Sequence, residues 1–220
     1  KAMYAPLLPH VMHRADLNYL LDNMGAEIAV GHSYVRGGDM PDVAPPGAPE
    51  PGLLGADFTV ENGRYRIARI YTAESWNPEL RAPLAEPGVN VSRGDYVLAV
   101  NGAELRAPDN LYRLLDGTAN RQTVLTVNSR PTMDGARQVT VLPVANEQGL
   151  RTRAWVEHNR RLVDSLSQGR LAYVFVPNTG QPGYTSFNRY YFAQQDRQGA
   201  VIDERYNGGG SAADYIVDIL

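Results

Sequence analysis

The stretch DFTVENGRYRIARI (residues 57–70) carries the strongest structural signal in the chain. Two segments rich in β-branched and aromatic residues, 57–60 and 65–70, lie on either side of the dipeptide Asn62-Gly63. Asn-Gly readily adopts the positive φ angles that a two-residue hairpin turn requires. The stretch therefore predicts an antiparallel β-hairpin, and it indicates that the region around it is built from strands.

The β pattern continues through residues 52–145. A short helix is expected at 108–116, with Pro108 suited to its first position and Gly117 to its end. Further strands are expected at 97–100, 123–127 and 138–142. Several short strands and one short helix predict a small, partly open β-barrel for this region.

The residues before this region are of a different kind. Residues 12–24 predict a helix because their large apolar side chains recur on one face, and Gly25 is expected to end it. Residues 31–39 form a short, glycine-punctuated β-prone segment. Residues 41–51 contain five prolines, which exclude a helix or a central strand and predict an extended linker between two domains.

In residues 146–220 helical and strand patterns alternate. Helices are expected at 153–167, 185–195 and 211–220, and buried strands at 171–176 and 200–202. In the first of these helices the apolar residues expected to face inward are Val156, Leu162, Val163 and Leu166. Such alternation predicts parallel strands in an α/β layer. The expected fold class is thus mixed α/β, with the β-barrel of residues 52–145 between a helical part at 1–40 and an α/β part at 146–220.

Composition excludes several kinds of chemistry. The chain has no cysteine, which rules out disulfides, thiol catalysis and cysteine-bound zinc. The net charge of −3 and the dispersed arginines give no basis for binding nucleic acid, and no apolar run could span a membrane. His10 and His13 could share a metal ion, but Pro9 and the lack of a nearby carboxylate pair favour surface histidines. We expect no metal and no cofactor, and no compartment is indicated.

The segment AVIDERYNGGGSAADYIVDIL (200–220) is a strand, a glycine loop and a helix, with Ser211 and Asp214 spaced as a capping pair. Free backbone N–H groups at a helix start can bind an anion, either a phosphate or the oxyanion of an acyl intermediate. The phosphate interpretation is weak because no phosphate-loop motif is present and no lysine follows Lys1. A simple tight turn remains an equal alternative from the residues alone.

Three segments resemble one family in its order along the chain. IDERYNGGG (202–210) resembles the strand-loop signature of the tricorn-type branch of the carboxyl-terminal processing serine peptidases. GAEIAVGHSYVRGGD (25–39) resembles the segment that carries the catalytic histidine of that branch, and WNPELRAPLAEPGVNVSRGDYVLAVNG (76–102) resembles its PDZ domain. The resemblance covers essentially the whole chain, and it implies peptide hydrolysis through an acyl-enzyme.

The resemblance assigns roles to particular residues. His32 matches the general base, although the family's serine before this histidine is replaced by Gly31, which leaves its orienting group open. The oxyanion-hole loop corresponds to Gly208, Gly209 and Gly210, with the donor among them unassigned. Ser211 is interpreted as a cap, because the family's nucleophile lies tens of residues further along. We therefore expect an internal segment that is inactive by itself.

A PDZ domain implies recognition of a peptide C-terminus by a loop of backbone N–H groups. Leu53, Leu54, Gly55 and Ala56 stand where that loop belongs, just before the strand at 57–60. Leu111, Leu114 and Leu115 are candidate walls of the side-chain pocket, with ordinary core packing as the alternative. The domain could also serve as a spacer between the catalytic parts.

The function predicted for the parent protein is that of a tricorn-like serine peptidase that acts on peptides or proteins and forms a homo-oligomer. Two alternatives remain: a non-catalytic PDZ peptide-binding module and an inactive family member. Aromatic residues at helical spacing could line a substrate groove, but that spacing favours the core: Phe187, Tyr190, Tyr191 and Phe192.

Overall fold

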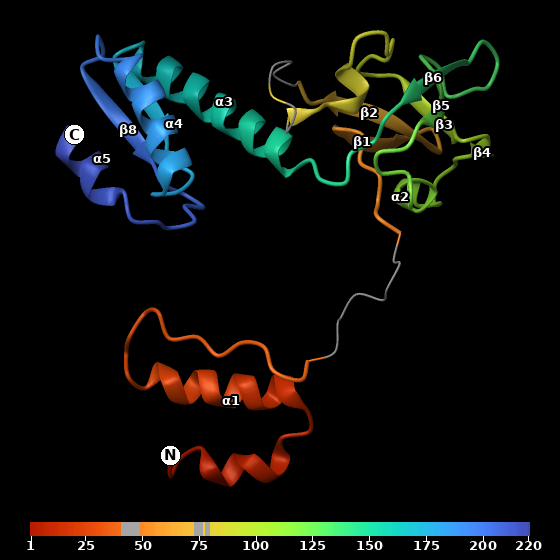
Figure 1. Cartoon of the computed structure of the whole chain (residues 1–220). Helices are drawn as coiled ribbons and strands as arrows, with labels where there is room; N and C mark the ends of the chain where they lie inside the picture. The colour runs from red at the N-terminus through yellow and green to blue at the C-terminus, as the bar shows by residue number, and fades with distance from the viewer. Residues whose placement is uncertain (41–48, 73–76, 78–79) are drawn as a thin grey trace. The chain divides into compact units, whose positions relative to one another are not determined.

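The computed structural model describes residues 1–40, 49–72, 77 and 80–220 (Figure 1). The chain forms two compact units, Lys1–Ala48 and Pro49–Leu220, and each is described by itself. Most of the expected linker, residues 41–48, lies outside the described residues. At its end, Pro51 forms an isolated antiparallel bridge with Asp116.

The first unit contains the 3-10 helix η1 (Ala5–His10) and the helix α1 (Arg14–Ala26). Asp16 caps α1 because its Oδ2 accepts hydrogen bonds from the backbone N–H groups of Met12 (3.0 Å) and His13 (3.3 Å). The predicted stop at Gly25 is wrong, since the helix includes Gly25 and ends one residue later.

No strand forms within residues 31–39, so the β-prone expectation for that segment is also wrong. Its backbone is bound by side chains of α1 instead of by a neighbouring strand. Asn18 Nδ2 donates to the carbonyl of Gly37 (2.9 Å), and Asp22 Oδ1 accepts from the N–H of Val35 (3.2 Å).

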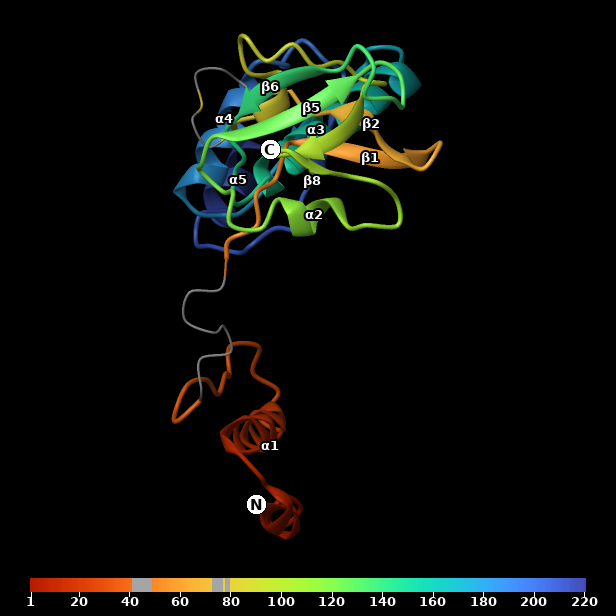
Figure 2. The ribbon, with the colours of Figure 1, turned by 90° about the vertical axis from the view of Figure 1, so that its right-hand side faces the viewer.

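The second unit begins with an antiparallel sheet in the order β1-β2-β3-β5-β6, with β4 paired to β3 (Figures 1 and 2). The predicted hairpin is confirmed, with Asn62 (φ 53°) and Gly63 (φ 70°) in the turn between β1 and β2. The strands are β1 (Ala56–Glu61), β2 (Arg64–Ile70), β3 (Tyr96–Val100), β4 (Ala103–Glu104), β5 (Thr123–Asn128) and β6 (Arg137–Val141).

The predicted mixed α/β fold is confirmed, and the region predicted as a partly open β-barrel is an open sheet with edge strands β1 and β6. Leu53 and Val144 form an isolated bridge that links the segment before β1 to the segment after β6. The helix α2 (Leu111–Leu114) is shorter than predicted and begins after Pro108. Asn110 sets its start, because its Oδ1 accepts the N–H of Tyr112 (3.0 Å).

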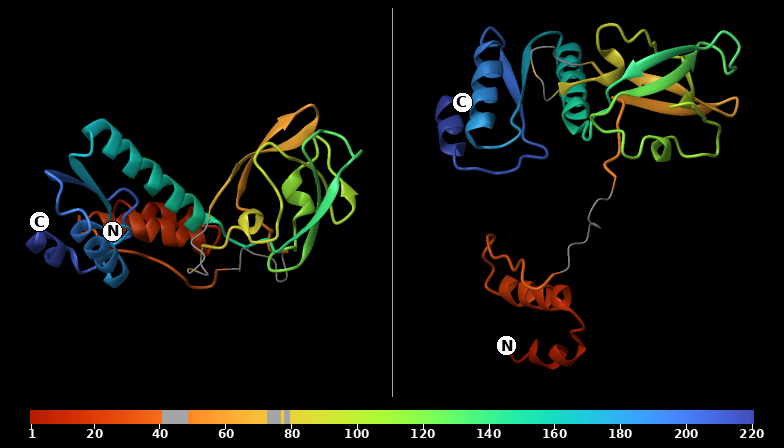
Figure 3. Two further views of the ribbon diagram at one scale, coloured as in Figure 1. Left: turned by 90° about the horizontal axis from the view of Figure 1, so that it is seen from above. Right: turned by 45° about the vertical axis from the view of Figure 1, so that its right-hand side comes forward.

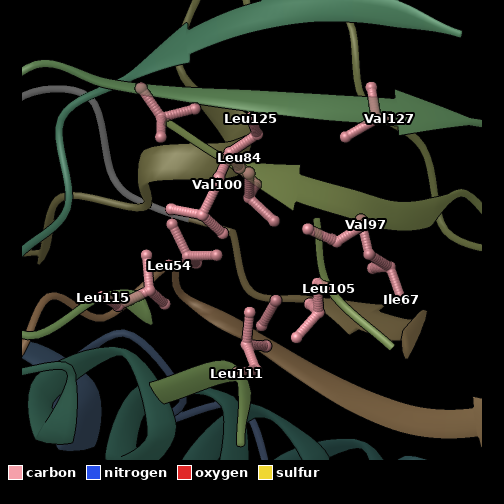
Figure 4. Close-up of a cluster of buried hydrophobic side chains, with 12 residues drawn as sticks. Leu54, Ile67, Leu84, Val97, Val100, Leu105, Leu111, Leu115, Leu125 and Val127 are labelled. Carbon is pink, nitrogen blue, oxygen red and sulfur yellow. The ribbon is translucent and has the colours of Figure 1, made fainter. Parts of the chain in front are cut away.

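Apolar side chains from the sheet, α2 and the 3-10 helix η3 (Pro83–Ala85) form one core (Figure 4). Every residue of β3 is buried, as expected for the central strand. Each fully buried Leu or Val contributes about 1.5–3 kcal/mol relative to exposure. The core consists of Leu54, Ala56, Ile67, Leu84, Val97, Val100, Leu105, Leu111, Leu115, Leu125, Val127 and Val141.

The remainder of the unit contains the parallel pair β7 (Leu171–Phe175) and β8 (Gly199–Asp203), which confirms the predicted parallel pairing. Tyr173 and Phe175 face α3 (Gln148–Ser167), whereas Val174 and Val176 pack with Phe187 of α4 (Gln181–Phe192). Alternate strand residues point to opposite faces, so β7 lies between the two helices, whose ribbons are seen in Figure 3. The last helix is α5 (Ala213–Ile219).

Several boundaries and burials in this part differ from expectation. Helices α3 and α4 begin earlier than predicted, at Gln148 and Gln181. Leu166 is 76% exposed and Leu162 is 46% exposed, although helical periodicity predicts that both face inward. Strand β8 is exposed at Val201 because β7 is its one partner among the described strands. None of the described helices is long and apolar enough to cross a membrane.

Candidate functional site

The triple-glycine loop, Gly208–Gly210, follows β8 and lies against the segment that follows β7. Gly208 N–H donates to the carbonyl of Pro177 (3.0 Å), and the Gly209 carbonyl accepts from Thr179 N–H (2.9 Å). The N–H of Gly209 donates to Asn207 Oδ1 (2.7 Å). Within the described part of the chain, Gly210 N–H donates to no acceptor. Two of the three glycine N–H groups are therefore used in hydrogen bonds, and the third, that of Gly210, is available.

Gly210 is required by both conformation and space. Its φ of 144° is disfavoured for residues with a side chain, and a Cβ atom there would lie 2.3 Å from the carbonyl carbon of Thr179. The backbone of the loop can approach the β7 segment this closely because the residue is glycine. By contrast, a Cβ at Gly208 would meet its nearest neighbour at 3.9 Å.

Two asparagines that sequence reasoning missed hold this loop and its neighbour. Asn207 Nδ2 donates to the carbonyl of Val176 (3.1 Å) while its Oδ1 accepts from Gly209. Asn178 Oδ1 accepts the N–H groups of Gly180 (3.0 Å) and Gly183 (3.1 Å) at the start of α4. Asn207 directly precedes the three glycines, so an Asn-Gly dipeptide like Asn62-Gly63 was present as a signal there.

Ser211 does not cap the last helix, which corrects the predicted capping pair with Asp214. The N-cap position of α5 is Ala212, no side chain caps it, and the side chain of Ser211 is exposed. The backbone fixes the helix start instead, because Ala212 N–H donates to the carbonyl of Thr179 (2.6 Å).

A buried carboxylate lies at the end of β8. Asp203 accepts hydrogen bonds from Tyr173 OH (2.6 Å), from Arg205 Nη2 (2.5 Å) and Nε, and from the backbone N–H of Arg205 (3.1 Å). Chiefly through the bond to Arg205, the pKa of Asp203 is lowered to about 2. Burial and the bond to Asp203 raise the pKa of Tyr173 to about 12. The ionised Asp203 therefore fixes the first turn of the segment that leads to the glycines.

Arg205 and Tyr206 lie against Trp155 of α3. The guanidinium carbon of Arg205 is 4.6 Å from the centre of the Trp155 ring, and the rings of Tyr206 and Trp155 meet edge-on at 5.7 Å. Trp155 also meets Phe175 of β7 edge-on at 5.3 Å. These contacts tie the strand ends to α3.

Two adjoining cavities lie beside the carboxyl end of β7, of about 460 and 440 Å³. Both are bordered by Gln148, Thr152, Phe175 and Pro177. The first also reaches Tyr206, and the second reaches Tyr190 of α4. Ligands of α/β sheets commonly bind outside the carboxyl ends of the strands, which is where these cavities lie.

His32 lies in the first unit, in the segment that follows α1. Its side chain is exposed and meets the ring of Tyr34 edge-on at 6.3 Å. No hydrogen bond to its imidazole forms within residues 1–40. At Gly31, a Cβ would have nothing within 4 Å, so this position has room for a larger residue. His10 lies in η1 and His13 precedes α1.

The 52–56 loop, Gly52–Ala56, leads into β1, whose first residue is Ala56. Leu53 N–H donates to the carbonyl of Val144 (2.7 Å), and Gly55 N–H donates to the side-chain Oε2 of Glu147 (2.9 Å). Leu54 and Ala56 are buried, as are the candidate pocket residues Leu111 and Leu115, which belong to the core of the sheet. Leu114 packs against this core from a partly buried position.

The aromatic residues of α4 divide between core and surface. Phe187 is fully buried and stacks on Tyr191 at 5.1 Å, which confirms core packing for this pair. Tyr190 and Phe192 are exposed.

Comparison with known proteins identifies relatives along the whole chain. Residues 52–146 match the family model described as the tricorn protease PDZ domain. The chain is 38% identical to "Tricorn protease homolog 1" of Streptomyces coelicolor over 99% of its length, and 35% identical to the "Putative Tricorn-like protease C-terminal subunit" of Sulfurisphaera tokodaii. It covers 20% and 24% of these relatives, respectively.

A solved structure gives the same result. The crystal structure of the tricorn protease superposes with a TM-score of 0.82 at 28% identity, over 99% of this chain and 21% of that one. The chain therefore spans about a fifth of the length of the relatives it matches.

Proposed function

Because this chain belongs to the tricorn protease family, we propose that it is part of a serine peptidase that hydrolyses peptide bonds through an acyl-enzyme. The observation that carries the proposal is the triple-glycine loop at the end of a parallel strand. Its Gly210 N–H has no acceptor within the described residues and is free to bind a developing oxyanion.

In this proposal His32 is the general base and Gly210 contributes one oxyanion donor, while Gly208 and Gly209 shape the loop. A serine hydroxyl attacks the peptide carbonyl carbon as His32 takes its proton, and the oxyanion forms against the Gly210 N–H. The C–N bond then breaks as His32 returns the proton to the amine, and water releases the acyl group. Loss of one such donor typically lowers kcat by about 10²–10³.

We place the nucleophile outside residues 1–220, as the family resemblance implies. The one serine beside the glycines, Ser211, is exposed. The 220-residue chain alone is then expected to have no peptidase activity. The parent is expected to act on peptides or proteins without a metal or cofactor, and to work as a homo-oligomer.

The test uses the longer parent protein, which includes the remaining catalytic residues. A fluorophosphonate probe, which labels activated serines, is applied to the wild type and to His32→Ala. His10→Ala is the matched control, because His10 is another exposed histidine of the same unit. We expect labelling of the wild type and the control, and at least a hundredfold slower labelling of His32→Ala.

Each other outcome has a definite meaning. Labelling that persists in His32→Ala would show that another residue is the base. A folded wild type that resists the probe would exclude an active peptidase. It would leave the PDZ peptide-binding module or an inactive family member.

A further inference from the structure

The 52–56 loop already holds a carboxylate in this chain. Gly55 N–H donates to Glu147 Oε2 at 2.9 Å, and the side chain of Glu147 is 9% exposed. Gly55 has a φ of 68°, a left-handed conformation that glycine adopts without strain. The donor and the acceptor lie 92 residues apart in the sequence, so tertiary packing brings them together.

The second oxygen of Glu147 is bound as well. Its Oε1 accepts from Arg151 Nε (2.7 Å) and from Arg151 Nη2. Arg151 Nη1 donates to Asp57 Oδ1 (2.8 Å) and to Tyr71 OH (2.9 Å), which join it to β1 and to the end of β2. A backbone N–H and a guanidinium thus bind the two oxygens of one carboxylate, as a terminal carboxylate of a peptide would be bound.

Packing beside the loop fixes helix α3 in this position. Leu150, one turn after Glu147, is buried with Tyr71 and Ala82. A Cβ at Gly55 would lie 3.3 Å from Leu150 Cδ1, so the loop and the helix are in close contact. The carboxylate is therefore presented by a docked helix and not by a mobile side chain.

We propose that the 52–56 loop is a carboxylate site whose resident ligand is the side chain of Glu147, so that it binds helix α3 in place of a peptide C-terminus.

This arrangement closes the site to free peptides. A peptide that adds to the edge strand β1 needs the loop for its carboxylate, and Glu147 holds Gly55 N–H while Val144 holds Leu53 N–H. To displace Glu147, a peptide would have to expel a buried, paired charge and separate it from Arg151. The site is suited to a carboxylate at the end of an extended peptide. In this protein the side-chain carboxylate of Glu147 occupies it.

The first test uses the wild-type 220-residue chain and a short peptide that ends in valine with a free carboxylate, beside its amide. Backbone amide NMR follows the Gly55 N–H during titration. We expect no shift at Gly55 with either peptide. A Gly55 shift that saturates only with the free carboxylate would overturn the proposal, and this test needs no variant.

The second test vacates the site by Glu147→Ala. Glu157→Ala is the matched control, because Glu157 also pairs with an arginine of α3, Arg160 (3.0 Å). We expect Glu147→Ala to lower Tm by about 5 °C, and sodium acetate to restore about 2 °C relative to equal sodium chloride. The control should lose about 1 °C and should not respond specifically to acetate.

The vacated site should also bind the peptide. We expect Glu147→Ala to bind the free-carboxylate peptide about tenfold or more tightly than the wild type does, with no gain for the amide. A folded variant that responds to neither acetate nor peptide would overturn the proposal. If Glu147→Ala does not fold, Glu147→Gln replaces it. Its neutral amide loses the ion pair with Arg151, so the free-carboxylate peptide should displace it from Gly55 more easily than it displaces Glu147. Neither result depends on catalysis, so failure here leaves the peptidase proposal intact.

Discussion

The two glycine-containing loops of the second unit use the same backbone device in different states. In the 52–56 loop, Gly55 has a φ of 68° and its N–H is bound by a carboxylate of the chain itself. In the triple-glycine loop, Gly210 has a φ of 144° and its N–H has no acceptor within the described residues. Glycine lets each loop expose a backbone N–H group. The loops differ because the fold places a carboxylate oxygen of Glu147 on one of these N–H groups and no acceptor from the described residues on the other. A filled donor stabilises structure, whereas an open one is available for a ligand or an intermediate.

The strongest test of this comparison is Gly210→Ala. The substitution forces a Cβ to within 2.3 Å of the Thr179 backbone at a disfavoured φ, so we expect a loss of about 3 kcal/mol or more in the free energy of unfolding. Gly208→Ala is the control, because its Cβ would have 3.9 Å of space, and it should cost less than about 1 kcal/mol. Urea unfolding measures both. Equal costs would mean that the close approach at Gly210 is not required.

The next effect is expected at Asp203, which orders the segment before the glycines. Asp203→Asn removes the charge that binds Arg205 and Tyr173, and we expect a loss of about 2 kcal/mol in the free energy of unfolding. Urea unfolding measures this loss, and a cost below about 0.5 kcal/mol would mean that Asp203 does not order the segment.

The same carboxylate predicts a pH dependence. Its pKa of about 2 in the folded protein lies below the unfolded value of about 3.9. Its contribution is therefore complete above about pH 5 and is lost as the pH falls from about 4 to 2. We expect it to reach about 1–2 kcal/mol, because the exposed side chain of Arg205 is screened by water. Between pH 5 and 2 the free energy of unfolding should therefore fall by about 1–2 kcal/mol more in the wild type than in Asp203→Asn. Parallel curves would contradict the assignment.

A smaller effect is expected in the filled loop. Arg151→Met leaves Glu147 with Gly55 N–H alone and should cost about 1–2 kcal/mol, since the guanidinium is partly exposed. Arg160→Met on the same helix removes one short-range pair with Glu157 and should cost about 0.5 kcal/mol or less. Thermal unfolding of the two variants compares them. If Arg160→Met costs as much, the loop has no special role in docking α3.

The smallest effect is expected for Ser211→Ala, directly after the open loop. Its side chain caps nothing and is exposed, so stability should change by less than about 0.5 kcal/mol. Fluorophosphonate labelling of the parent should also be unchanged. A loss of labelling would identify Ser211 as the nucleophile and would contradict its assignment outside this chain.

Local signals predicted the local structure well. Asn62-Gly63 specifies its hairpin because the turn conformation depends on those two residues, and the alternating pattern after residue 146 predicted the parallel pair β7 and β8. Gly25 did not end its helix, because a single glycine costs only about 1 kcal/mol within one. Leu166 is exposed because helical periodicity identifies an apolar face but not whether a described partner covers it.

The site was predicted only in outline. The glycines were found because three in succession are unusual. The sequence does not indicate that the N–H groups of Gly208 and Gly209 are used in hydrogen bonds whereas that of Gly210 is open. Asn207 was missed since its role depends on contact with Val176, 31 residues earlier. Glu147 was missed for the same reason, because nothing in its neighbourhood indicates a bond to Gly55.

Helix α3 connects the two loops mechanically. Glu147 engages one loop, and Trp155, about 12 Å further along the axis, contacts the residues that lead into the other. Because both contacts depend on the position of one helix, a change that undocks α3 from the 52–56 loop would also disturb the packing of Trp155 against Arg205 and Tyr206. The fluorescence emission of Trp155 would report that change.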